Sequence, residues 1–155
     1  MIILFAADGL PGVRSVEIMQ GRMTALCAPG YLREGTLLQP ADLAMARLLH
    51  MSQNGRSPNT DWAAFFAGTG AEPVAPKPDQ VFTSFLICLQ AAMNGDGICI
   101  GWQDLMDDHI RAGRLTLACD RIVPTDRSYH ACVSERARHN PAAAAFLDWI
   151  GGAAA

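Results

Sequence analysis

Residues 82–115 constrain the fold more strongly than any other part of the chain, because regular elements follow one another there with clear punctuation. Thr83 or Ser84 can cap a helix, and the apolar residues after them recur with helical spacing. Gly95 and Gly97 end that periodic pattern. The first half of the stretch therefore predicts a helix that starts directly after an extended segment.

The second half of the same stretch predicts a strand, a helix and another strand. Residues 98–100 are an apolar run with two isoleucines, typical of a strand buried on both faces, and Gly101 closes it. A helix is predicted at residues 104–111, before Gly113, and an alternating strand at residues 114–117. Because strand-helix-strand units build parallel sheets, the pattern favours an α/β fold.

The rest of the chain divides into shorter predicted elements separated by glycine and proline. We expect extended segments at residues 1–5, 22–28, 48–51 and 80–82, and the first of them is expected to be buried. Short helices are expected from Pro40 and around Trp62, Phe65 and Phe66, and a final helix from Asn140 and Pro141 to Ile150. Loops are expected at residues 52–60 and 72–79, and a turn at residues 125–128.

The composition indicates a folded chain that does not bind nucleic acid through a basic face. Its 155 residues suffice for one domain, 50% of them are hydrophobic, and the formal net charge is -3. Lys77 is the single lysine and the arginines are scattered, whereas phosphate binding needs clustered basic residues. Direct DNA binding by these residues is therefore not expected.

The cysteines and the apolar runs predict a cytoplasmic protein without membrane contact. The 5 cysteines are odd in number and lack a CxxC spacing, so buried free thiols are expected. Residues 1–7 are too short for a signal-peptide core and lack basic residues before them. No apolar run approaches the roughly 20 residues that span a bilayer.

Phe82, Thr83 and Ser84 form a candidate ligand clamp. The first N–H groups of a helix are unpaired and carry positive dipole character, so they can hold a small anion such as a carboxylate. A plain helix cap is the alternative. Gly101 and Trp102 follow the neighbouring predicted strand, at the kind of strand end where open α/β sheets bind ligands. Trp102 could stack on a ligand or be a packed surface indole.

No catalytic, metal or cofactor site is predicted. Residues 107–109 (Asp-Asp-His) point in different directions on a helix, which favours a solvated face, with Asp104 or Asp108 paired to Arg111 or Arg114. The remaining candidates are equally weak: His50, His130 and His139 lack ligand-spaced neighbours, Gly95-Asp96-Gly97 precedes a strand where a dinucleotide loop must follow one, and no serine lies in GxSxG.

The order of these segments resembles a known family. QAAMNGDGICIG followed by DDHIRAGRL is similar to the effector-binding domain of LysR-type transcriptional regulators, in which a helix ending in AAxxGxGxxxG precedes a helix and AGRL. GYLREGTLLQPADLAMARLLHM, DWAAFFAGTGAE and SYHACVSERARHNPAAAAFLDWI extend the resemblance in family order over nearly the whole chain. PADLA, LLHM and W followed by FF are similar to the glycine-cleavage-regulator subgroup.

The resemblance implies a type 2 periplasmic-binding-protein-like α/β fold, with two α/β subdomains joined by two crossing strands. The implied divisions are 1–22 as a remnant of subdomain I, 23–29 as a crossing strand, 30–128 as subdomain II, 129–134 as the second crossing strand, 135–150 as the C-terminal helix of subdomain I, and 151–155 as a frayed tail. Ala28, Pro29 and Cys132 would form the hinge.

The chain also departs from the family pattern. The family carries a winged helix-turn-helix, a linker helix and the start of the first subdomain before the residue that matches Met1, so we expect an N-terminal truncation and an incomplete first subdomain. Where members have a segment like DLAIRYGDG, this chain has MIILFAADG. Phe5 then stands at an arginine position, which weakens the case for an anionic ligand.

The resemblance implies effector sensing in transcription regulation. A small, anionic metabolite would bind between the subdomains at Phe82, Thr83, Ser84, Gly101 and Trp102, and would shift a conformational equilibrium by its difference in affinity for the two states. DNA would be contacted only through the absent winged helix-turn-helix, and a homo-oligomer is expected. The alternatives are a solute-binding protein of similar fold, which would need export, and a small α/β enzyme, which would need a convergent catalytic set.

Overall fold

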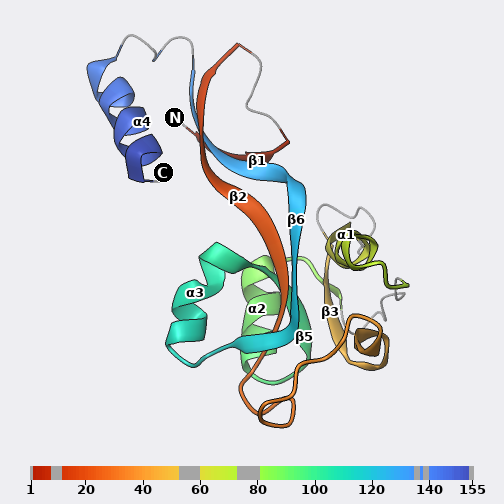
Figure 1. Ribbon diagram of the computed structural model, residues 1–155. Helices are drawn as coiled ribbons and strands as arrows, with labels where there is room; N and C mark the ends of the chain where they lie inside the picture. The colour runs from red at the N-terminus through yellow and green to blue at the C-terminus, as the bar shows by residue number, and fades with distance from the viewer. Residues whose placement is uncertain are drawn as a thin grey trace. The chain divides into compact units, whose positions relative to one another are not determined.

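A computed structural model describes residues 2–7, 12–52, 60–72, 81–134, 137 and 140–153. The chain forms two compact units (Figure 1). Unit 1 comprises Met1–Gly21 and Pro124–Ala155, and unit 2 comprises Arg22–Val123. Two long strands, β2 (Arg14–Cys27) and β6 (Thr116–Val133), contribute residues to both units.

The sheet of unit 2 has the strand order β6-β2-β5-β3-β4. Strand β3 (Leu48–Met51) pairs in parallel with both β4 (Val81–Phe82) and β5 (Ile98–Trp102), whereas β2 pairs antiparallel with β5. Because β4 and β5 lie on either side of β3 and are joined through a helix, they form a parallel crossover, which agrees with the predicted α/β class although the predicted strand-helix-strand unit was the one at residues 98–117.

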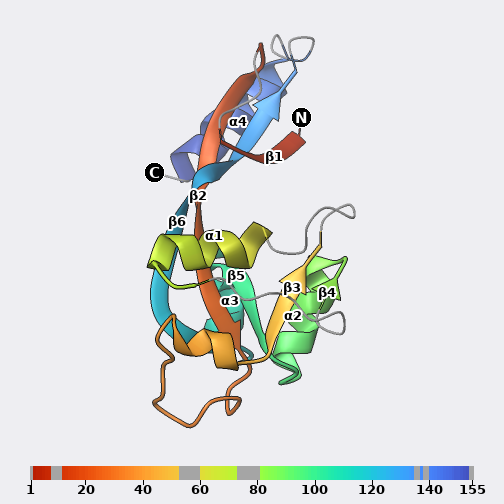
Figure 2. The same ribbon diagram turned by 90° about the vertical axis from the view of Figure 1, so that its right-hand side faces the viewer.

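Helices cover both faces of this sheet (Figures 1 and 2). The 3-10 helix η1 (Asp42–Met45) and α1 (Thr60–Thr69) lie on one face, and α2 (Phe85–Met93) and α3 (Gln103–Arg111) on the other. Alternate strand residues supply the two cores, since Ile98 and Ile100 pack on the α1 side while Cys99 packs on the α2 side. The sheet is therefore the middle layer of a three-layer arrangement.

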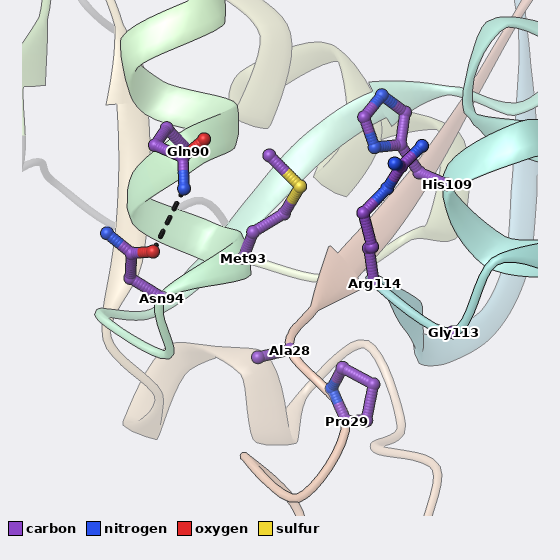
Figure 3. A pocket seen from close by; sticks show the side chains of 8 residues that line it. All are labelled: Ala28, Pro29, Gln90, Met93, Asn94, His109, Gly113 and Arg114. Atoms are coloured by element: carbon purple, nitrogen blue, oxygen red, sulfur yellow. Dashed lines mark hydrogen bonds between the residues drawn. The ribbon is translucent and has the colours of Figure 1, made fainter.

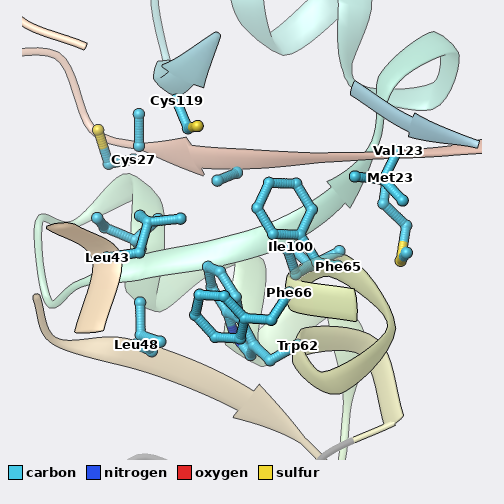
Figure 4. Packing of buried hydrophobic residues seen from close by; sticks show 13 residues of the cluster. Met23, Cys27, Leu43, Leu48, Trp62, Phe65, Phe66, Ile100, Cys119 and Val123 are labelled. Carbon is cyan, nitrogen blue, oxygen red and sulfur yellow. The ribbon is translucent and has the colours of Figure 1, made fainter. Parts of the chain in front are cut away.

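An aromatic cluster anchors α1 to the sheet (Figure 4). Trp62, Phe65 and Phe66 are each at most 1% exposed, and the Trp62 and Phe66 rings stack with their centroids 5.6 Å apart. The indole Nε1–H of Trp62 donates a hydrogen bond to the Leu49 carbonyl at 2.8 Å. The i, i+3, i+4 spacing of these three residues thus forms the predicted helical face.

Unit 1 is the smaller of the two units. Strand β1 (Ile2–Ala6) pairs antiparallel with β6, and the rings of Phe5 and Tyr129 lie 4.7 Å apart. Helix α4 (Pro141–Ala153) buries Leu147 against Ala131 and Val133 of β6. As predicted, Asn140 caps this helix, because its Oδ1 accepts a hydrogen bond from the Ala142 N–H at 2.9 Å.

Several local predictions were wrong, and tertiary pairing explains most of the differences. Strand β1 is not buried, since Ile2 and Ile3 are 54% and 56% exposed. No turn forms at residues 125–128, because β6 continues through them and Ser128 pairs with Ala6. Ladder pairing therefore overrides the local turn propensity of Thr-Asp-Arg-Ser.

Helix and strand ends also differ from the predicted ones. Pro40 does not start a helix, since η1 begins at Asp42 and is a 3-10 helix. Gly101 does not close β5, which runs to Trp102. The predicted tail is instead the last turn of α4, which extends to Ala153, with Gly151 close to Val16. The predicted strand after Gly113 begins at Thr116, and β2 separates it from β5, so the strand-helix-strand unit does not join neighbouring strands.

Other predictions are confirmed. Strand β3 has the predicted bounds, α1, α2, α3 and α4 lie where periodicity placed them, and all five cysteines are buried free thiols. The loop predicted at 52–60 and the linker predicted at 72–79 fall mostly outside the described residues. Within the described part of the chain, no helix is long and apolar enough to span a bilayer.

Candidate functional site

Three parallel strands of unit 2 end at a common edge. Met51 of β3 pairs with Phe82 of β4, and Leu49 of β3 pairs with Cys99 of β5. Continuing the second register along the strands brings Met51 level with Gly101, so Phe82, Met51 and Gly101 lie in one row across the sheet. The row spans two strand spacings, about 10 Å. The carboxyl edge of a parallel sheet is where open α/β folds bind ligands.

Helix α2 starts at this edge with uncommitted hydrogen-bond donors. Ser84 is its N-cap residue, in extended conformation (φ -125, ψ 127), yet its side chain makes no capping hydrogen bond within the described part of the chain. The first helical bond runs from the Cys88 N–H to the Ser84 carbonyl at 3.0 Å, so the N–H groups of residues 85–87 have no intrahelical acceptor. Thr83 is exposed and Ser84 half-buried. These groups are suited to a small oxygen-rich ligand.

Gly101 and Trp102 have packing roles at the same edge. A Cβ added at Gly101 would lie 2.5 Å from Leu26 Cδ1 and 2.9 Å from Met106 Cγ, so the glycine allows β2 and α3 to approach closely. Trp102 is half-buried against the α1-side core, whereas Phe82 packs on the α2 side. A ligand would therefore meet both rings only at the rim of the sheet, where the two faces join.

Sequence reasoning missed three residues at this edge. Ser52 follows β3, and its N–H donates to the Phe82 carbonyl at 2.8 Å. Arg22 forms an ion pair with Asp104 in the first turn of α3. The Oε1 atom of Gln103 is buried without a hydrogen-bond partner among the described residues. Of these three residues, only Ser52 could have been identified from the sequence, because it directly follows the correctly predicted strand β3.

The acidic residues of α3 are used in surface ion pairs. Arg111 contacts Asp107 at 3.1 Å and Asp108 at 2.9 Å, with all three side chains at least 45% exposed. The solvated face predicted for residues 107–109 is confirmed for Asp107 and Asp108 but not for His109, whose Nδ1 is buried, and Asp104 pairs with Arg22 and not with Arg111 or Arg114. Such exposed pairs contribute at most about 1 kcal/mol each to stability.

The buried thiols are poor nucleophiles. Burial raises the pKa of the Cys27 thiol to about 11, and burial together with the neighbouring Cys88 and Cys27 sulfurs raises the pKa of Cys99. The reactive thiolate is therefore scarce at neutral pH. Among the residues that the structure describes, no group of three His, Cys, Asp or Glu side chains is arranged to hold a metal ion.

The three predicted hinge residues lie within the units. Ala28 is buried and Pro29 exposed, directly after β2 in unit 2, and Cys132 is buried in the β6 part of unit 1. The units themselves change at Gly21/Arg22 and at Val123/Pro124, so their bounds differ from the predicted crossing strands. At that first boundary, a Cβ on Gly21 would lie 2.5 Å from the Arg127 carbonyl oxygen. The hinge assignment stays a prediction.

Comparison with known proteins identifies a single family. The family model described as the LysR substrate binding domain matches residues 1–155. The glycine cleavage system transcriptional activator of Escherichia coli (strain K12) is 25% identical over 149 residues, which cover 96% of this chain and 47% of that protein. The HTH-type transcriptional regulator TrpI of Pseudomonas aeruginosa is 29% identical over 152 residues, covering 96% and 50%. The chain thus spans about half the length of these curated relatives.

Solved structures show the same fold. The effector domain of the transcriptional regulator AmpR of Pseudomonas aeruginosa has a TM-score of 0.78 at 22% identity, covering 98% of this chain and 70% of that one. The regulatory domain of CrgA from Neisseria meningitidis has a TM-score of 0.70 at 22% identity, covering 99% and 75%. The predicted type 2 periplasmic-binding-protein-like α/β fold is confirmed by these neighbours.

Proposed function

Since the chain belongs to the LysR substrate-binding domain family, we propose that it is the effector-sensing part of a transcription regulator. Its ligand is a small metabolite that binds at the carboxyl edge of β3, β4 and β5 in unit 2. Family membership favours this function over a solute-binding protein or a small α/β enzyme. Ligand binding would act by favouring one of two conformations, with Ala28, Pro29 and Cys132 as the proposed hinge.

The uncommitted donors at the start of α2 are the observation that carries this proposal. Thr83, Ser84 and the first N–H groups of α2 follow Phe82 directly in the chain, and neither the Ser84 hydroxyl nor these N–H groups form a helical capping bond among the described residues. A carboxylate matches that set, because its oxygens only accept hydrogen bonds and the helix N-terminus favours negative charge. Phe5 pairs with Tyr129 in unit 1 and adds no charge, so the helix start supplies the main attraction for an anion. Trp102 and Gly101 complete the proposed site.

The partners follow from the same assignment. We place DNA binding in a separate winged helix-turn-helix, because the described arginines form no basic face and several are paired with aspartates. We also propose that the regulator is a cytoplasmic homo-oligomer. Leu86 and Ile87 on α2 are 74% and 61% exposed, and apolar side chains at such levels of exposure are typical of an interface.

Binding by calorimetry tests the proposed site. A thermal-shift screen of small carboxylates and amino acids, glycine included because one relative is a glycine cleavage activator, would first identify a ligand of the 155-residue chain. The double variant Thr83→Ala/Ser84→Ala should then bind it tenfold to a hundredfold more weakly, about 1.5 to 3 kcal/mol for hydrogen bonds to a charged group. Alanine keeps the extended φ of Ser84, which proline would not.

Thr36→Ala is the matched control, because Thr36 is an exposed threonine in the segment between β2 and η1. It should bind the ligand as tightly as the parent. Equal affinity of the parent and the double variant would mean that the effector site lies elsewhere and that Ser84 is only a helix start. Unchanged thermal unfolding of both variants without ligand separates lost binding from lost folding.

A further inference from the structure

A groove opens at the other end of α2, away from the candidate effector site (Figure 3). Its volume is about 630 Å³, within the range of small-molecule sites. It lies entirely within unit 2, where the ends of α2 and α3 meet the turn after β2. The lining residues are Ala28, Pro29, Gln90, Met93, Asn94, His109, Gly113 and Arg114. Since α2 has 9 residues, the groove is about 13 Å along the helix from Ser84.

Arg114 brings an unneutralised positive charge to this groove. Among the described residues its guanidinium has no ion-pair partner, whereas Arg111, three residues earlier, is held between Asp107 and Asp108. Figure 3 shows the Arg114 side chain extended along the groove toward His109. None of the described lining residues is acidic. The groove therefore favours an anion.

His109 lines the same groove with its imidazole uncommitted. Its Nδ1 atom is buried and has no hydrogen-bond partner among the described residues. An atom without accessible surface cannot be reached by a ligand in the groove, so His109 shapes the groove wall and offers no hydrogen bond through Nδ1.

The remaining lining residues define the rest of the ligand. The Gln90 amide donates to Asn94 Oδ1 at 2.9 Å, so these two side chains hold each other, on the other side of Met93 from Arg114 (Figure 3). Met93 and Pro29 form an apolar wall, and Met side chains adapt readily to ligand shape. A ligand with one carboxylate and one apolar portion matches both kinds of surface.

Two helix C-termini face the groove, and their negative dipole ends oppose an anion. Their final carbonyls are already engaged, for example by the Asn94 and Ala112 N–H groups. The guanidinium of Arg114 can form two charge-assisted hydrogen bonds with a carboxylate, whereas the helix ends act on it only through their dipoles.

We propose that this groove is a second ligand site, which binds a small carboxylate with an apolar body. The carboxylate meets Arg114, and the apolar part lies against Met93 and Pro29. The site is separate from the effector site at the start of α2. A regulator with both sites can respond to two metabolites.

Phenylacetate and its neutral amide phenylacetamide are suitable probes, because they share a shape and differ in charge. Titration of the 155-residue chain, followed by amide NMR shifts, should move the resonances of Met93, His109 and Arg114. Arg114→Gln should weaken phenylacetate binding about tenfold, and phenylacetamide should bind the parent protein no better than phenylacetate binds that variant.

Arg111→Gln is the control, since it removes the same charge from a residue that does not line the groove. It should leave phenylacetate affinity unchanged, as should Thr83→Ala/Ser84→Ala at the effector site. Equal weakening by Arg111→Gln and Arg114→Gln would overturn the proposal, because it would reveal only general attraction of anions. Absence of shifts at Met93, His109 and Arg114 up to about 10 mM phenylacetate, a binding energy near 3 kcal/mol, would overturn it as well.

Discussion

The helices α4 and α2 each follow a polar residue of a type that favours the N-cap position, but the two residues behave differently. In unit 1, Asn140 precedes α4 and its side chain accepts a hydrogen bond from the Ala142 N–H at 2.9 Å. In unit 2, Ser84 precedes α2 and its hydroxyl makes no capping bond among the described residues. A polar cap residue can serve the helix or a ligand, and in unit 2 it is left available. The contrast teaches that a cap-like sequence does not by itself distinguish structure from binding.

The two units also differ in the size of their described apolar cores. Unit 2 has two apolar clusters on opposite faces of its sheet, which include Trp62, Phe65 and Phe66. The core described for unit 1 centres on Ala131, Val133 and Leu147. A well-packed unit can tolerate uncommitted polar groups at its edge because the stability comes from elsewhere. Unit 2 can therefore carry the proposed effector site without disturbing its core.

The largest effect should come from removing the aromatic anchor of unit 2. Trp62→Ala creates a cavity and leaves the Leu49 carbonyl without its donor, so the free energy of unfolding should fall by about 4 kcal/mol or more. Leu147→Ala in unit 1 should lower it by about 2 to 3 kcal/mol, because it removes a smaller side chain and leaves no hydrogen-bond acceptor without its donor. Urea unfolding followed by circular dichroism measures both. Equal losses would show that the two cores are equally well packed.

Alkaline pH should selectively weaken unit 2. Burial raises the pKa of the Cys27 thiol from 9.0 to about 11, so between those pH values the unfolded chain releases this proton while the folded chain keeps it. The stabilisation is complete below pH 9 and is lost as pH rises toward 11, by about 2 kcal/mol. Denaturant unfolding at a series of pH values checks this. Cys27→Ala should flatten the curve, and an unchanged slope in that variant would exclude Cys27 as the cause.

Much of the fold could be predicted because local pattern and tertiary structure agree over most of unit 2. The spacing of Trp62, Phe65 and Phe66 predicted α1, and glycines correctly marked the end of α2 and α3. The turn at residues 125–128 was predicted wrongly because pairing of β6 with β1 is a non-local interaction. The exposure of β1 was missed for a similar reason, since an apolar run does not reveal which neighbours cover it.

The candidate site was predictable only in part. The position of Thr83 and Ser84 between a strand and a helix could be inferred from local pattern. The ion pair between Arg22 and Asp104 joins residues far apart in the chain, so no local signal announces it. The groove near Arg114 also has no local sequence signal, because it forms where three separate segments meet. A sequence pattern identifies a local junction between a strand and a helix well. It identifies poorly a site that several distant segments form together.

The smallest predicted effect concerns the residues that precede α4 and α2. Asn140→Ala removes a capping bond and should lower the free energy of unfolding by about 1 kcal/mol. Ser84→Ala removes a hydroxyl that makes no capping bond, so it should change stability by no more than about 0.5 kcal/mol. Urea unfolding of both variants in the absence of ligand provides the measurement. With a bound carboxylate the order should reverse, because Ser84→Ala then loses a ligand contact and Asn140→Ala does not. If Ser84→Ala without ligand is as destabilising as Asn140→Ala, the hydroxyl is a structural cap in solution, and the helix start is not free for an effector.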